Sequence, residues 1–119
     1  RPGQAKFRKE VLLRCNQRCV VTGCDTIEVL EAAHIVPFSD SNPSDQENPK
    51  NGIALRADVH TLFDLNLLYV HWDGANLRWA LDSNVTYLDG VRNKDCDDVF
   101  VDNEVNNFLK ASGRAPSYF

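Results

Sequence analysis

The middle of the chain reads as a strand, a long loop, a second strand and a helix, and this order limits the folds open to it. Residues 28–36 are mostly apolar, and Pro37 ends the predicted strand because proline cannot donate a ladder hydrogen bond. Residues 38–51 are rich in Ser, Asp, Asn and Pro, a composition typical of loops. Residues 53–55 predict a second short strand, and apolar residues at helical spacing predict a helix over residues 57–66.

The flanking segments predict two more helices and several short strands. Apolar residues at helical spacing indicate a helix over residues 5–16. Alternating segments over residues 67–72 and 77–81 flank a Gly-containing turn, which predicts a β-hairpin. Residues 84–101 are expected to hold further short strands.

Capping residues fix the expected helix ends. Asp58 or a neighbour can cap the helix of residues 57–66, and Asp102 can cap a last helix that Gly113 stops. No internal repeat or second domain is visible. The sequence therefore predicts one α+β domain over residues 1–119, with a strand–strand–helix core, an N-terminal helix, and a C-terminal hairpin plus helix.

His60 and Asp64 lie four residues apart on a predicted helix, so their side chains can point at one object. An imidazole nitrogen and a carboxylate oxygen suit a divalent cation such as Mg²⁺, Mn²⁺ or Zn²⁺. Such pairs are also frequent on helix surfaces that bind nothing. Taken alone, the pair leaves both interpretations open.

His34 lies within an apolar strand, where an imidazole is costly unless it has a partner. With a reference pKa of about 6.5, histidine can accept a proton at neutral pH as a general base. The alternative is a core histidine with satisfied hydrogen bonds. Asn51 precedes Gly52, which is an ordinary turn signal when taken alone.

Taken together, these motifs resemble the HNH nuclease family, closest to the branch found in restriction-type endonucleases. The resemblance spans residues 3 to about 70. The residues that carry it are 3–8, 19–24, 30–37 and 51–64.

The resemblance implies a ββα-metal core and a role for four side chains. His34 matches the general base that activates water. Asn51 matches the asparagine that braces the loop and helps to orient the base. His60 matches a metal ligand, and Asp64 falls where colicin-type relatives place another.

One position departs from the family pattern. Many members carry Asp or His immediately before the first histidine as a metal ligand, whereas this chain has Ala33 there. Glu31, two residues back on the same strand face, is a further candidate ligand. Water and substrate phosphate can also complete the coordination shell, which is normal for Mg²⁺, the cation we expect.

Basic residues are concentrated at the N-terminus although the net charge is −4. Six of the 13 Lys and Arg residues lie in the first 18 positions, where Glu10 is the only acidic residue. This end is expected to bind phosphate, or alternatively to form a solvated helix face. Arg56 starts a helix that relatives press into the minor groove, or is a solvated surface arginine. The candidate nucleic-acid-binding residues are Lys6, Arg8, Lys9 and Arg56.

The cysteines include no Cys-x-x-Cys pair, so we expect free and mostly buried thiols. A structural zinc ion on all of them is the alternative, although their spacing suits one only in part. They are Cys15, Cys19, Cys24 and Cys96.

The sequence and the resemblance together predict a metal-dependent endonuclease. We expect double-stranded DNA as the substrate and a cleavage module of a restriction or defence system as the context, with a homodimer as one option. The absence of Met predicts that the chain is a fragment of a longer protein whose further domains are missing. No apolar run approaches 18 residues and no secretory start is visible, which predicts a cytoplasmic protein without membrane contact. The alternative function is a catalytically silent, HNH-derived module that binds nucleic acid or protein.

Overall fold

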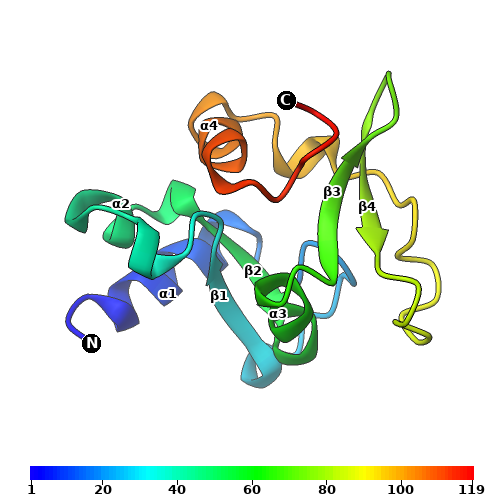
Figure 1. Cartoon of the computed structure of the whole chain (residues 1–119). Coiled ribbons are helices and arrows are strands. Elements are labelled where there is room, and N and C mark those ends of the chain that lie inside the picture. Colours follow the sequence, from blue (N-terminus) through cyan, green and yellow to red (C-terminus); the bar gives the residue numbers. More distant parts are fainter.

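Four α-helices and two antiparallel strand pairs make up the chain, which a computed structural model describes over residues 1–119 (Figure 1). The expected α+β class is confirmed. In chain order the elements are α1 (Gln4–Arg14), β1 (Leu30–His34), α2 (Pro43–Glu47), β2 (Gly52–Arg56), α3 (Ala57–Asp64), β3 (Leu68–Trp72), β4 (Leu77–Leu81) and α4 (Asn103–Ser112). Single 3-10 turns cover Ile27–Val29, Phe38–Asp40, Pro49–Asn51 and Asp97–Val99.

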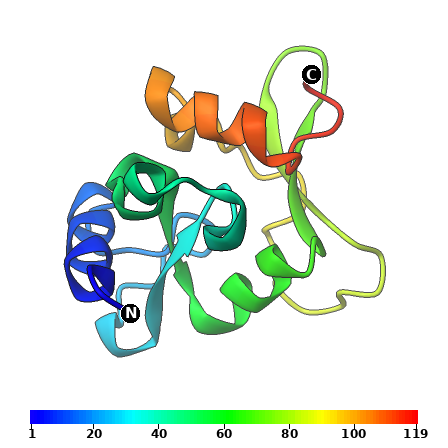
Figure 2. The same cartoon turned by 60° about the vertical axis from the view of Figure 1, so that its left-hand side comes forward.

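A strand–strand–helix unit forms the centre of the molecule. β1 and β2 pair antiparallel, with His34 opposite Gly52, and α3 follows β2 without a loop. α1 and α3 lie on opposite sides of this strand pair (Figure 2). The space between these elements is filled by fully or almost fully buried side chains, among them Leu12, Ala33, Ile35, Ile53, Leu55, Val59 and Phe63.

The C-terminal half adds the hairpin and the last helix that the sequence predicted. β3 and β4 pair antiparallel, and Trp79 of β4 is fully buried. Asp102 caps α4, because its Oδ1 accepts from the backbone N–H groups of Glu104 and Val105. Gly113 ends α4 in the left-handed conformation, with φ 74°. None of the helices combines the length and the apolar character that crossing a bilayer requires.

The long loop is more ordered than the sequence predicted. β1 is shorter than residues 28–36, and the segment of residues 38–51 contains α2. A local cap explains this helix: the side chain of Asn42 accepts from the N–H of Asp45, and Pro43 occupies the first turn. The prediction that residues 38–51 form a loop was therefore wrong for the residues of α2.

Two other local predictions were wrong. Residues 84–101 contain no named strand, only an isolated bridge between Asp95 and Arg78 of β4. Leu88 and Asn93 have positive φ angles of 63° and 65°, which interrupt an extended chain. Asp58 does not cap α3; Arg56 holds the N-cap position without a side-chain bond.

Candidate active site

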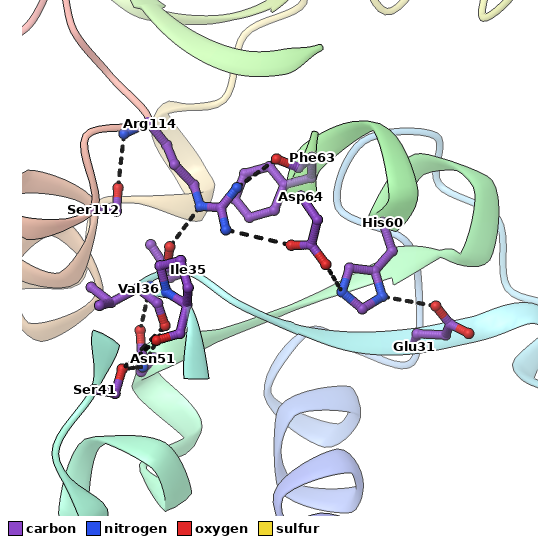
Figure 3. Close-up of polar contacts among 11 residues, drawn as sticks. Glu31, Ile35, Val36, Ser41, Asn51, His60, Phe63, Asp64, Ser112 and Arg114 are labelled. Carbon is purple, nitrogen blue, oxygen red and sulfur yellow. Dashed lines mark hydrogen bonds and ion pairs between the residues drawn. The ribbon is translucent and has the colours of Figure 1, made fainter. Parts of the chain in front are cut away.

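His60 lies between two carboxylates at the surface of the strand–strand–helix unit. Its Nδ1 is 2.7 Å from Oε1 of Glu31 on β1, and its Nε2 is 3.0 Å from Oδ2 of Asp64, one turn later on α3 (Figure 3). The side chains of Glu31 and Asp64 are about half exposed. On each side of the ring one nitrogen and one carboxylate oxygen face each other, a pair of donors that suits a divalent cation. The structure thus brings together the three side chains that the sequence offered as metal ligands.

His34 ends β1 and is held in one orientation. Its ring stacks on Phe7 of α1, with centroids 4.1 Å apart and planes 5° apart, and meets the edge of Phe38 at 5.6 Å. Its Nε2 lies 2.8 Å from the carbonyl oxygen of Gln46, an acceptor, so the ring donates from Nε2 and Nδ1 is left unprotonated. The pKa of His34 is lowered, and burial is the largest cause. The hydrogen bond to the Gln46 carbonyl raises the pKa in part, and the positive charge of Arg1 lowers it further. This environment favours the neutral ring that a general base requires.

One pocket connects the two histidines. Its volume is about 360 Å³, and His34, His60, Asp64 and Arg114 all line it. Arg1 lines this pocket and the neighbouring one of about 290 Å³ beside Glu31 and His60. A group that enters this space meets a neutral histidine, a histidine–carboxylate pair and two guanidinium groups.

Asn51 ends the 3-10 turn that precedes β2 and is fully buried. Its Oδ1 accepts from the N–H of Val36 at 2.9 Å, and its Nδ2 donates to the carbonyl oxygen of Asp45 at 3.1 Å. Asp45 precedes Gln46, whose carbonyl holds His34. Asn51 therefore links the end of β1 to the loop that orients the His34 ring, without lining the pocket itself.

The candidate phosphate-binding residues fall into two places. Lys6 and Lys9 are exposed on α1, where Lys6 approaches Glu10 at 3.8 Å. Arg8 lines the pocket beside His60, and its Nη2 donates to the backbone carbonyl of Leu30 at 3.0 Å. Arg56 lies apart from both histidines and makes a two-point ion pair with Asp58.

Sequence reasoning missed three contributors to the site. Arg114, which follows the last helix, reaches the pocket from beyond α4. Arg1 packs its guanidinium over the Phe38 ring at 3.8 Å. Gln46 contributes through its backbone, which no side-chain pattern can indicate. For Arg114 the only signal in the sequence is an arginine directly after a helix-stopping glycine, which says nothing of where it reaches.

The donor set fits a hydrated divalent cation. His60 offers a nitrogen and Asp64 an oxygen toward the pocket that His34 also lines. No group of three or more His, Cys, Asp or Glu side chains converges as a preformed metal cage, so water and phosphate would supply the other ligands. Ala33 is fully buried and offers no donor.

The cysteines do not converge on one site either. All four are free thiols, Cys19 and Cys96 being buried and the other two half-buried. Because they form no metal-binding group, the zinc alternative is not supported. Burial raises the pKa of the Cys96 thiol to about 12, which keeps it protonated at neutral pH.

Comparison with known families agrees with this geometry. A family model described as HNH endonuclease matches residues 19–71, which contain β1, β2 and α3 together with His34, Asn51, His60 and Asp64. This match supports assignment of the chain to the HNH endonuclease family, whose members generally use a divalent metal ion. No curated protein matches the chain.

Proposed function

We propose that this chain is a metal-dependent endonuclease that hydrolyses phosphodiester bonds in double-stranded DNA, as the cleavage module of a restriction or defence system. The observation that carries the proposal is the pocket that His34 shares with His60 and Asp64. It provides a candidate base and a candidate metal-binding pair on the two sides of one space. The match of residues 19–71 to the HNH endonuclease family model supports a nucleic-acid substrate.

In this proposal His34 is the general base. Its Nε2 is engaged by the Gln46 carbonyl, so Nδ1 is available to take a proton from the attacking water. Asn51 is the positioning residue that keeps the Gln46 loop in place. Arg1, which lines the same pocket, would meet the negative charge of the phosphate.

His60 and Asp64 are the residues proposed to hold the cation, and Glu31 is a third candidate on the opposite side of the His60 ring. Magnesium is the cation that we favour, with Mn²⁺ and Zn²⁺ as alternatives, because an open site with one carboxylate suits a hydrated ion. A divalent ion bound there would neutralise the phosphate and stabilise the leaving oxygen. Lys6 and Lys9 would extend the contact along the DNA backbone through the exposed face of α1.

A supercoiled-plasmid assay tests the proposal, with Mg²⁺, Mn²⁺, Zn²⁺ or EDTA. Wild-type protein should nick or linearise the plasmid only with metal, and His34→Ala should lower the rate by about 10²–10⁴-fold. His71→Ala is the matched control, because His71 is an exposed histidine of the hairpin and lines none of the pockets at His34 and His60. Circular dichroism must show that all variants are folded.

A second candidate function is a module that binds nucleic acid without cutting it. The observation that favours it is the lack of a donor at Ala33, which leaves the metal-binding pair without a ligand from the centre of β1. No cleavage by folded protein with any of the three metals, together with DNA binding in a fluorescence titration, would favour this alternative over the nuclease.

A further inference from the structure

Arg114 is an arginine buried at the edge of the site, outside the residues that the family model matches. Only 5% of the residue is exposed. It follows Gly113, which ends α4, and its guanidinium carbon lies 4.0 Å from the centre of the Phe63 ring. Burying a guanidinium costs free energy unless its N–H groups are paired, so the partners of Arg114 indicate what its burial supports.

The three guanidinium nitrogens of Arg114 each donate to a different residue at the end of β1 or of α3. Nε donates to the carbonyl oxygen of Ile35 at 2.7 Å, and Nη1 donates to the carbonyl oxygen of Phe63. Nη2 lies 3.4 Å from Oδ1 of Asp64 (Figure 3). Ile35 directly follows His34, so one side chain ties the end of β1 to the end of α3.

The two oxygens of the Asp64 carboxylate have different partners. Oδ1 faces Arg114, while Oδ2 faces Nε2 of His60 at 3.0 Å. Asp64 is the last residue of α3, and its side chain is 55% exposed. At such a position a free carboxylate would sample several rotamers, and contact with a buried guanidinium restricts it to one.

We propose that Arg114 is a positioning residue that fixes Asp64 so that its Oδ2 and the His60 ring bind the same cation. The segment after α4 is then part of the working site. This inference rests on the proposed function, because it assigns Asp64 to the metal. Groups that hydrogen-bond to metal ligands typically change metal affinity by about 10–100-fold when they are removed.

The direct test measures the affinity of the whole chain for Mn²⁺ in the absence of DNA. Electron paramagnetic resonance detects the bound ion. Arg114→Gln should weaken Mn²⁺ binding by about 10–100-fold. Arg114→Lys should weaken Mn²⁺ binding less than Arg114→Gln, because an ammonium keeps the positive charge. It should still bind Mn²⁺ more weakly than the wild type, because an ammonium cannot make the three-point contact. Both affinities are measured under conditions where the variants are folded, as judged by circular dichroism.

Arg92→Gln is the matched control. Arg92 also donates to backbone carbonyl groups, those of Leu81, Asp82 and Val85, but it lines none of the pockets at the histidines. Its loss should lower the free energy of unfolding and leave Mn²⁺ affinity unchanged. This separates a positioning role from a general loss of stability.

A measurement on the wild type covers the case in which the Arg114 variants do not fold. During titration with Mg²⁺, the ¹⁵N resonance of Arg114 Nε should shift with the same midpoint as the resonances of the His60 ring. No shift of Arg114, or folded Arg114 variants that bind Mn²⁺ like the wild type, would overturn the inference while leaving the nuclease proposal intact. A wild-type chain that binds no metal would overturn both.

Discussion

The Nε2 atom of His34 lies 2.8 Å from the carbonyl oxygen of Gln46, so the ring donates to a loop and keeps Nδ1 free to accept a proton. Because burial lowers the pKa of His34, its ring stays neutral below the ordinary value of 6.5. A base must be neutral to act, so kcat/KM should fall only as the pH drops through this lowered pKa. We expect the acidic limb of the pH profile to lie below pH 6.5.

Arg1→Gln tests the cause of this shift. The positive charge of Arg1 contributes to the lowered pKa of His34, so its removal should move the acidic limb toward higher pH. The measurement is plasmid cleavage from about pH 5 to about pH 8 at limiting substrate. A limb at or above pH 6.5 in the wild type would contradict the assignment of His34 as a buried neutral base.

Asn51→Ala should cost both stability and activity. The substitution leaves the Val36 N–H and the Asp45 carbonyl, both partly buried, without their present partner, at up to about 1–3 kcal/mol for each group. Cleavage should slow because Asp45 adjoins the Gln46 carbonyl that orients His34. Urea unfolding and initial cleavage rates measure the two effects.

The control for Asn51 is Asn107→Ala, since Asn107 is an exposed asparagine of α4. Its free energy of unfolding should change by less than about 0.5 kcal/mol. An Asn51→Ala variant as stable and as active as Asn107→Ala would refute the bracing role.

Gly52→Ala should disturb the base through helix α1. A Cβ atom at Gly52 would lie 2.5 Å from Cγ2 of Val11 and 2.8 Å from Cζ of Phe7, too close for either contact. Because Phe7 stacks on His34, relief of this clash moves the surface that supports the ring. We expect a loss of about 1–3 kcal/mol in thermal or urea unfolding, and slower cleavage.

The double variant Gly52→Ala with Val11→Ala provides the check, because it removes one of the two clashing groups. The two changes should then be less destabilising together than the sum of the single effects. Strict additivity would mean that the clash does not involve Val11.

Local patterns in the sequence predicted the elements that hold the site. The apolar spacing of residues 5–16, the hairpin signature around the turn after Trp72, and the Asp102 cap all describe interactions within a few residues. Residues 84–101 were misjudged because their conformation follows side-chain bonds to distant backbone, such as Lys94 Nζ to the carbonyl oxygen of Val21 at 2.8 Å. No local pattern contains such a contact.

The candidate site likewise contains residues that a local motif predicts and residues that only the tertiary structure brings in. His34, His60 and Asp64 were found because their order and spacing form a motif, and the fold then brings them to one pocket. Arg114 is separated by 79 residues from Ile35, to which it donates, so its place in the site is a property of the tertiary structure. The motif predicts which side chains carry the proposed chemistry, whereas the long-range contacts determine how firmly these side chains are held.

Asp58 should make the stability of the chain depend on pH in the acidic range. Hydrogen bonds from Arg56, the largest cause, and from Tyr87 lower the pKa of Asp58 from 3.8 to about 2. Because the folded-state pKa lies below the unfolded value, this contribution is fully present above pH 3.8 and is lost as the pH falls through about 2. The advantage of the wild type over Asp58→Asn in urea unfolding should therefore be greater at about pH 6 than at about pH 2.5. Tyr87→Phe removes one hydrogen bond to Asp58 and keeps the Arg56 pair. It should therefore lower the free energy of unfolding by less than Asp58→Asn, again more at about pH 6 than at about pH 2.5. An equal advantage at both pH values would mean that the Arg56–Asp58 pair contributes nothing to folding, as many exposed ion pairs do.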